Sequence, residues 1–263
     1  MPHEKGLHLR TTFSYNYAME DHSRQERLQQ KIDAYRPSAE RLAYVSDTHL
    51  LFLVGISGAG KDTITHELLA QHADYYRMVT HTTRAPRKNH GVLEQEGVEY
   101  HFVDLATAEH MLDEHDYVEA NMYGGNVYGT SIREIQKAHD EHKIIIGDID
   151  VNGVASFMKL GLNVRPVFVL PPSYAVWQER LLRRYEHGID EADWRKRMET
   201  ARHEIEHALD TDYFYLVVND DLQTTTGHIN HIARQGELDE HRPAAALAAA
   251  QEILAGINDA LER

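Results

Sequence analysis

The sequence contains no cysteine among its 263 residues. A disulfide framework is therefore excluded, and any zinc site would have to use histidine and carboxylate ligands. The chain also has no apolar run near the ~20 residues that span a bilayer. Its first thirty residues lack the apolar core of a signal peptide. These absences favour a cytoplasmic protein that is not embedded in a membrane.

Positive charge is scarce relative to negative charge. The chain has 27 Lys and Arg residues against 42 Asp and Glu residues, which gives a formal net charge of −15. This balance argues against non-specific binding to nucleic acid or to anionic membranes. Phosphate-bearing substrates would have to be held by local groups of basic residues. We interpret the 19 histidines mostly as solvated surface residues, because no metal-binding cluster stands out among them.

A glycine-rich loop follows the first strongly apolar run. Residues 50–54 (LLFLV) predict a buried strand, residues 55–62 (GISGAGKD) form the loop, and residues 63–69 begin an amphipathic helix. This is the pattern of a P-loop, in which backbone N–H groups and the helix N-terminus hold phosphate. A plain glycine turn is the alternative interpretation. The residues expected to contact the nucleotide are Gly55, Ile56, Ser57, Gly58, Ala59, Gly60, Lys61, Asp62 and Thr63.

Short apolar runs alternate with helical patterns along the chain. Strands are predicted at 78–80, 117–119, 144–146, 164–170 and 213–218. Helices are predicted at about 62–73, 105–114, 131–141, 173–186, 190–208 and 222–234. The alternation predicts an α/β fold, a P-loop NTPase-type parallel sheet flanked by helices.

The organisation suggests a main domain with additions at both ends. We expect the main domain at 49–235, with a small strand-rich insertion at about 80–130. An N-terminal helical extension covers 1–48, and an alanine-rich helical tail covers 236–263. The apolar stripe of that tail must pack on its own core or on another subunit. A homo-oligomer through the terminal helices is therefore an expectation.

A second candidate anion site lies in residues 80–87 (THTTRAPR). Two arginines stand here on a loop stiffened by Pro86. Arginine forks match phosphate oxygens bidentately, so the pair suits a phosphomonoester. Two solvated surface arginines are the structural alternative.

Further segments follow in a fixed order: GVEYHFV at 97–103, YVEANMYGGNVYGT at 117–130, IIIGDIDVNGV at 144–154 and VVNDDL at 217–222. With the glycine loop and the arginine pair, this series resembles the guanylate kinase family from residue 50 to about 235. The resemblance implies Mg²⁺-dependent phosphorylation of GMP to GDP by ATP, with dGMP as a second substrate. It also implies a helical lid at about 183–197.

The resemblance implies a particular set of residues for GMP. The phosphate is assigned to Arg84, Arg87, Tyr100 and Tyr128, and the base to Glu119, Thr130 and Thr80, with Asp148 close by. The chemistry is consistent, because Glu119 can accept from the guanine N1 and N2 donors and Thr130 can donate to O6. Adenine reverses that pattern, so AMP would leave polar groups unpaired.

The resemblance also implies the residues that act on the transferring phosphoryl group and beside ATP. Catalytic roles fall to Lys61, Arg84, Arg180, Arg184 and Arg197, and Asn219 is expected beside the adenine. The stretch between the last two arginines is slightly longer than usual in the family, so Arg183 is an alternative to Arg184. Ion pairs of these arginines with neighbouring glutamates, and an ordinary turn at Asn219, are the structural alternatives.

Three aspartates are the expected magnesium ligands. Asp148 and Asp150 follow the strand at 144–146, at the carboxyl edge where open α/β sheets bind ligands. An N-cap role for Asp150 is compatible with this position. Asp62 stands where a P-loop usually has Ser or Thr, so we expect an altered metal optimum.

Residues 203–207 satisfy the H-E-x-x-H template of zinc peptidases. No third ligand is evident, and the same region matches the acidic helix that follows the lid in guanylate kinases. We therefore interpret this helix as a packing element rather than a zinc site.

Two other functions stay open. One is a kinase for a different nucleoside monophosphate. The other is a guanylate-kinase-like scaffold module that binds phosphoproteins without catalysis. The intact Lys61 and loop glycines favour the enzyme. The expected partners are the small-molecule substrates, and not nucleic acid.

Overall fold

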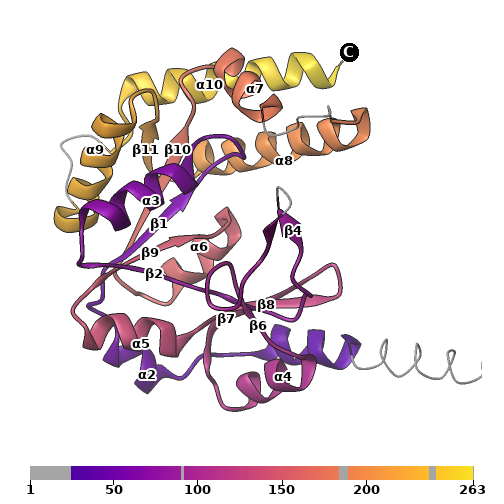
Figure 1. Ribbon diagram of the computed structural model, residues 1–263, viewed down its shortest axis with the longest axis vertical. Coiled ribbons are helices and arrows are strands. Elements are labelled where there is room, and N and C mark those ends of the chain that lie inside the picture. The colour runs from indigo at the N-terminus through magenta and orange to yellow at the C-terminus, as the bar shows by residue number, and fades with distance from the viewer. Residues whose placement is uncertain (1–24, 90–91, 184–188, 237–240, 263) are drawn as a thin grey trace, which may run out of the picture. The chain divides into compact units, whose positions relative to one another are not determined.

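The computed structural model describes residues 25–89, 92–183, 189–236 and 241–262, which fall into two compact units (Figure 1). The first unit contains the residues up to Leu42 together with Val79–Arg133. The second unit contains Ala43–Met78 and Glu134–Arg263. The strand-rich insertion predicted at about 80–130 thus makes up most of the first unit, which also includes part of the N-terminal extension.

The second unit is built on a five-stranded parallel sheet. Its strands run in the order β11-β10-β1-β9-β2. They are β1 (Leu50–Val54), β2 (Tyr75–Arg77), β9 (Ile144–Asp148), β10 (Val164–Leu170) and β11 (Tyr215–Val218). All five residues of β1 are buried, which explains why this strand is a continuous apolar run rather than an alternating one. The parallel sheet confirms the predicted fold class.

Helices flank this sheet, and several begin with a side-chain cap. They are α3 (Lys61–Gln71), α6 (Val151–Lys159), α7 (Tyr174–Leu182), α8 (Glu191–Asp210), α9 (Leu222–Gln235) and α10 (Ala244–Leu261). Asp150, Ser173, Asp190 and Asp221 accept a backbone N–H at the starts of α6, α7, α8 and α9. Two more helices, α2 (Ala39–Tyr44) and α5 (Ile132–Asp140), begin in the first unit and continue into the second. No helix in the described ranges combines the length and apolar character needed to cross a bilayer.

The C-terminal helix α10 packs on α7 and α8 within the second unit (Figure 1). Its stripe at Ala250, Ile253 and Ile257 is fully buried. Glu252 accepts a hydrogen bond of 2.8 Å from the Tyr174 N–H at the start of α7. The apolar face predicted from the tail sequence is therefore covered by the chain itself.

The first unit contains a four-stranded sheet in the order β6-β3-β8-β7. Its strands are β3 (His81–Thr82), β6 (His101–Phe102), β7 (Tyr117–Tyr123) and β8 (Asn126–Ser131). A separate hairpin pairs β4 (Lys88–Asn89) with β5 (Val92–Leu93), and α4 spans Leu105–Asp113. Helical residues 25–34 pack beside α4, where Leu28, Ile32, Met111, Leu112 and Tyr117 form a buried core.

The strand predicted at 78–80 is wrong in position. The strand lies earlier, at Tyr75–Arg77, on the edge of the second unit's sheet. The Met78 N–H still donates to the Ile146 carbonyl at 2.9 Å, and the chain then passes into the first unit at Val79. The prediction was based on the apolar residues Met78 and Val79, which connect the two units. The edge strand itself contains Tyr75, Tyr76 and Arg77, whose side chains carry polar groups.

Candidate active site

The glycine loop between β1 and α3 has the backbone that the P-loop pattern requires. Gly55 and Gly60 have φ angles of 132° and 98°, which side chains rarely adopt. A Cβ at Gly55 would lie 2.3 Å from the Val169 carbonyl oxygen, and one at Gly60 would lie 2.3 Å from the Asn219 side-chain nitrogen. Both positions therefore need glycine for conformation, and Gly55 also needs it for space against the backbone of Val169.

Side-chain hydrogen bonds, two of them from distant elements, hold this loop in place. The Trp177 indole N–H of α7 donates to the Ser57 carbonyl at 2.9 Å. The Asn219 amide, which follows β11, donates to the Ala59 carbonyl at 2.8 Å. The Lys61 ammonium folds back onto the Gly55 carbonyl at 2.6 Å. Three carbonyls of the loop thus accept hydrogen bonds from side chains, which stabilises its backbone conformation.

A cavity of about 590 Å³ opens at this loop within the second unit. It brings together most of the residues predicted for ATP and for the metal. Its lining residues are Gly55, Ser57, Gly58, Gly60, Lys61, Asp62, Thr63, Asp148, Arg180, Glu204, Asn219, Asp220 and Leu222. Ile56 and Ala59 are fully buried beneath the loop, so they support its shape.

The three predicted metal ligands have different environments. Asp62, in the first turn of α3, and Asp148, at the end of β9, are exposed and line the cavity. Asp150 caps α6, where its carboxylate accepts the Gly153 N–H at 2.7 Å. The described residues contain no preformed group of three or more His, Asp or Glu side chains for a metal. Of the three, Asp62 and Asp148 thus line the cavity, and Asp150 is engaged at the start of α6.

Two of the predicted lid arginines lie in the described residues. Arg180 lines the cavity and donates to the Asn219 carbonyl at 3.0 Å. Its Nη1 atom is buried and meets no acceptor in the described part of the chain, which suits an anion that arrives later. Arg197, on α8, lines a neighbouring cavity of about 250 Å³ with Ser57 of the loop. Arg184 lies outside the described residues.

Sequence reasoning missed Glu204 as a residue of this site. Glu204 lies on α8 and lines the cavity with Lys61. Burial raises the pKa of its carboxyl, the Lys61 charge opposes this shift, and Asp150 and Asp148 add to it. The H-E-x-x-H pattern did contain Glu204, but it pointed to zinc rather than to the phosphate loop. His207 of that pattern instead lies 3.2 Å from the Tyr213 hydroxyl.

In the first unit, the predicted phosphate-binding Arg84 is paired with a carboxylate. Two hydrogen bonds of 2.8 and 3.0 Å join its guanidinium to Glu94, and both side chains are buried. The same carboxylate accepts the Arg87 N–H at 2.7 Å. The Arg84 hydrogen bonds lower the pKa of Glu94. Glu94 therefore fixes the arginine loop, a role that its sequence position did not reveal.

Two tyrosines predicted for the same phosphate lie beside Arg84. The Arg84 guanidinium carbon sits 5.2 Å from the centre of the Tyr100 ring. The Tyr100 and Tyr128 rings are edge to face, with centroids 6.1 Å apart. Burial raises the pKa of the Tyr100 hydroxyl further above its ordinary value, so this hydroxyl is protonated at neutral pH as an exposed tyrosine is. The structure thus gathers Arg84, Tyr100 and Tyr128 into one group.

The predicted base-reading pair is directly joined. Glu119 on β7 faces Thr130 on β8, and the Thr130 hydroxyl donates to the Glu119 carboxylate at 3.1 Å. The Asn121 amide donates to the other carboxylate oxygen at 2.8 Å. Thr130 is completely buried, whereas Glu119 is half-buried and keeps access to solvent. Thr80 immediately precedes β3 of the same sheet.

Several known proteins are similar in sequence to this chain. A family model described as guanylate kinase matches residues 47–235. The chain is 36% identical over 198 residues to a guanylate kinase of Mannheimia succiniciproducens, covering 74% of this chain and 91% of that protein. It is 38% identical over 172 residues to a guanylate kinase of Schizosaccharomyces pombe, covering 64% and 82%.

A solved structure is also similar. The crystal structure of guanylate kinase from Anaplasma phagocytophilum matches with a TM-score of 0.51 and 26% sequence identity. The match covers 75% of this chain and 89% of that one.

Proposed function

This chain belongs to the guanylate kinase family, and we propose that its second unit binds ATP and its first unit binds the GMP that it phosphorylates. The supporting observation is the cavity at the glycine loop, where Lys61 and Arg180 supply cationic groups among backbone N–H donors. These are the groups that a triphosphate needs in a protein whose net charge is −15. ATP is thus assigned as the phosphoryl donor.

The pairing of Glu119 with Thr130 supports guanine as the base of the acceptor. A guanine would present its N1 and N2 donors to the Glu119 carboxylate. The Thr130 hydroxyl, which now donates to that carboxylate at 3.1 Å, can turn to the O6 acceptor. dGMP carries the same base and phosphate and is the expected second substrate.

The chemistry asks this chain mainly for alignment and charge neutralisation. Lys61 would leave the Gly55 carbonyl and place its ammonium on a phosphate oxygen of the donor. Arg84, fixed by Glu94, and Arg87 would hold the acceptor phosphate. Arg180 and Arg197, with Arg184 outside the described residues, would neutralise the transferring group and exclude water. A strong base is not needed, because the GMP phosphate is already an anionic nucleophile.

The residues at the cavity fit Mg²⁺ as the accompanying metal. Asp62 and Asp148 offer the hard oxygen ligands that Mg²⁺ prefers. A cluster of protein ligands is not required, because Mg²⁺ in such enzymes is held largely by substrate phosphates and water. When bound, Mg²⁺ would neutralise phosphate charge. Asp150 is the weaker candidate, since it caps α6.

A coupled assay of ADP release tests the proposed function. With ATP and Mg²⁺, we expect turnover with GMP and dGMP, and a kcat/KM for AMP lower by up to ~10⁴-fold. CMP, UMP and dTMP complete the panel. Faster turnover with one of these would assign a different monophosphate kinase. No ADP release with any of them would favour a non-catalytic, protein-binding role.

A magnesium titration of Asp62→Ser tests the metal assignment. Replacing the carboxylate should remove repulsion toward the triphosphate and restore the hydroxyl that P-loops place there. We expect half-maximal activity at a lower Mg²⁺ concentration, with the KM for GMP unchanged. Asp62→Asn is the matched control, because it removes the charge without supplying a hydroxyl. Superimposable titrations of the parent and Asp62→Ser would contradict a role for Asp62 at the metal.

Two broader expectations stay predictions. A cytoplasmic location follows from composition. A homo-oligomer would have to use surfaces other than the buried stripe of α10, which is covered within the second unit.

A further inference from the structure

The segment 25–42 lies before the region that matches the family model, which begins at residue 47. It nevertheless belongs to the same compact unit as Glu119, Thr130 and the arginine loop. Within this unit the segment covers apolar surface and also contacts the backbone that precedes Glu119.

The helical part of the segment is anchored by burial and by charge. Leu28 and Ile32 are 2% and 8% exposed and share a core with α4, Tyr117 and Val127. Lys31 reaches Glu109 and Asp113 of α4, each at 2.9 Å. These contacts fix the segment on α4 and on the strands that follow it.

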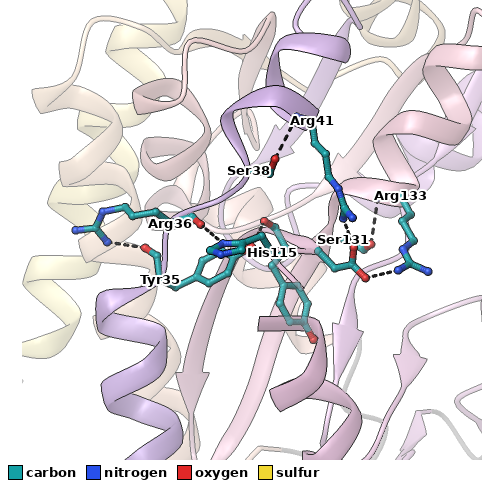
Figure 2. A network of polar contacts seen from close by, with 9 residues as sticks. Tyr35, Arg36, Ser38, Arg41, His115, Ser131 and Arg133 are labelled. Atoms are coloured by element: carbon teal, nitrogen blue, oxygen red, sulfur yellow. Dashed lines mark hydrogen bonds and ion pairs between the residues drawn. The ribbon is translucent and has the colours of Figure 1, made fainter. Parts of the chain in front are cut away.

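The residues after this helix form a polar network that ends at the start of β7 (Figure 2). The Tyr35 hydroxyl donates to the Tyr117 carbonyl at 2.5 Å. The Tyr35 ring stacks on His115, with centroids 5.8 Å apart, and the His115 ring nitrogen lies 2.7 Å from the Arg36 carbonyl. His115 has a φ of 53°, a conformation that such a residue seldom adopts without support. The segment thus holds the strained turn that leads into β7.

Asp116 is the second point where this segment meets the strand. It is 4% exposed and pairs with two arginines, Arg41 of α2 and Arg133 of α5 (Figure 2). The Arg133 contact is 2.5 Å. A buried carboxylate with only one of these partners would be costly, so Arg41 supports the backbone between His115 and Tyr117.

The backbone held in this way lies directly before Glu119 in β7. The pairing of β7 with β8 is regular up to Glu119 and Thr130, but shifts between Tyr117 and Glu119 in a bulge. A shift of one residue turns side chains to the other face of a sheet. The Tyr117 carbonyl, which Tyr35 binds, lies at this bulge. The Tyr117 ring also fills the space beside Gly129, where a Cβ would lie 2.7 Å from that ring.

We propose that Tyr35 is a positioning residue for GMP: its hydroxyl fixes the bulge that directs Glu119 toward the base, so the N-terminal segment is part of the acceptor site. The inference rests on the proposed role of Glu119. Tyr35 does not itself touch the substrate. It acts through the Tyr117 carbonyl, two residues before Glu119 in the chain.

The test compares Tyr35→Phe, Glu119→Gln and the double variant in the full-length protein. Tyr35→Phe keeps the stacked ring and removes only the hydroxyl. We expect its KM for GMP to rise about fivefold, the effect of one lost hydrogen bond, with the KM for ATP unchanged. In the Glu119→Gln background, the same change should have no further effect on GMP. Tyr44→Phe is the matched control, because its hydroxyl bonds Asp140 at 2.7 Å in an exposed setting.

Each outcome has a definite meaning. A rise confined to GMP in Tyr35→Phe, absent from Tyr44→Phe and lost in the double variant, supports the inference. Suppose that Glu119→Gln impairs GMP use, but Tyr35→Phe either has normal kinetics or raises the KM for GMP and the KM for ATP equally. This result overturns the inference about Tyr35 and leaves the proposed base site standing. Additive effects of the two substitutions also overturn it. Normal GMP kinetics in Glu119→Gln would overturn the proposed base site, and the inference with it.

Discussion

Lys61→Ala is expected to lower kcat by about 10³-fold, equivalent to about 4 kcal/mol of transition-state stabilisation. Lys61, the first residue of α3, lines the cavity at the glycine loop together with Arg180. Without Lys61, the negative charge on the transferring phosphoryl group would lose a cationic partner. The negative net charge of the chain would not compensate for this loss. The fold should survive, because the substitution removes one hydrogen bond of 2.6 Å to the Gly55 carbonyl. A hydrogen bond of a charged group contributes about 2 kcal/mol, which is a modest loss for a domain of this size.

Steady-state ADP release at saturating ATP and GMP measures this effect, and thermal unfolding by circular dichroism checks the fold. Lys159→Ala is the matched control, because this lysine is exposed at the end of α6 and does not line the cavity. Turnover near that of the parent in Lys61→Ala would refute the proposed mechanism.

Glu119→Gln is expected to reduce kcat/KM for GMP by about 10²-fold while leaving ATP binding intact. The carboxylate accepts hydrogen bonds from Thr130 and Asn121 and has the polarity that guanine N1 and N2 require. An amide in its place can direct an N–H group at those donors, so the loss includes a repulsive contact as well as a missing hydrogen bond.

Kinetics with GMP varied at fixed ATP, and with ATP varied at fixed GMP, separate the two effects. Glu114→Gln serves as the control, because Glu114 is exposed in the same unit at the end of α4. Equal losses for the two substrates in Glu119→Gln would indicate a general structural defect. Unchanged GMP kinetics would remove the substrate assignment.

The sequence predicted the parts of the site that depend on short, contiguous patterns. The structure has a strand, a glycine loop and a helix in the order predicted for this segment, with β1 at Leu50–Val54 and α3 at Lys61–Gln71. The reason is local, since left-handed glycines and a helix start are encoded within a few residues. The grouping of Arg84 with Tyr100 and Tyr128 followed from the ordered series of motifs rather than from any single one.

The features that sequence reasoning missed depend on contacts between distant residues. The pairing of Arg84 with Glu94 requires the hairpin at β4 and β5 to fold back. Glu204 reaches the glycine loop only because α8 packs beside it, far along the chain from Lys61. The hydrogen bond from Tyr35 to Tyr117 joins residues that are 82 positions apart in the chain. Periodicity reports which face of an element is apolar, but not which partner covers it.

The C-terminal helix α10 also affects where the C-terminal boundary of the folded domain lies. The family match ends at residue 235, before α10 begins. Yet Gly256 of α10 lies so close to the Tyr174 ring that a Cβ there would be 2.4 Å from it, and Glu252 binds the first N–H of α7. α7 carries both Trp177, which holds the glycine loop, and Arg180. A domain boundary placed at residue 235 would therefore remove the contacts that α10 makes with α7, the helix whose Trp177 holds the glycine loop. The unit defined by packing is longer than the region that matches the family model.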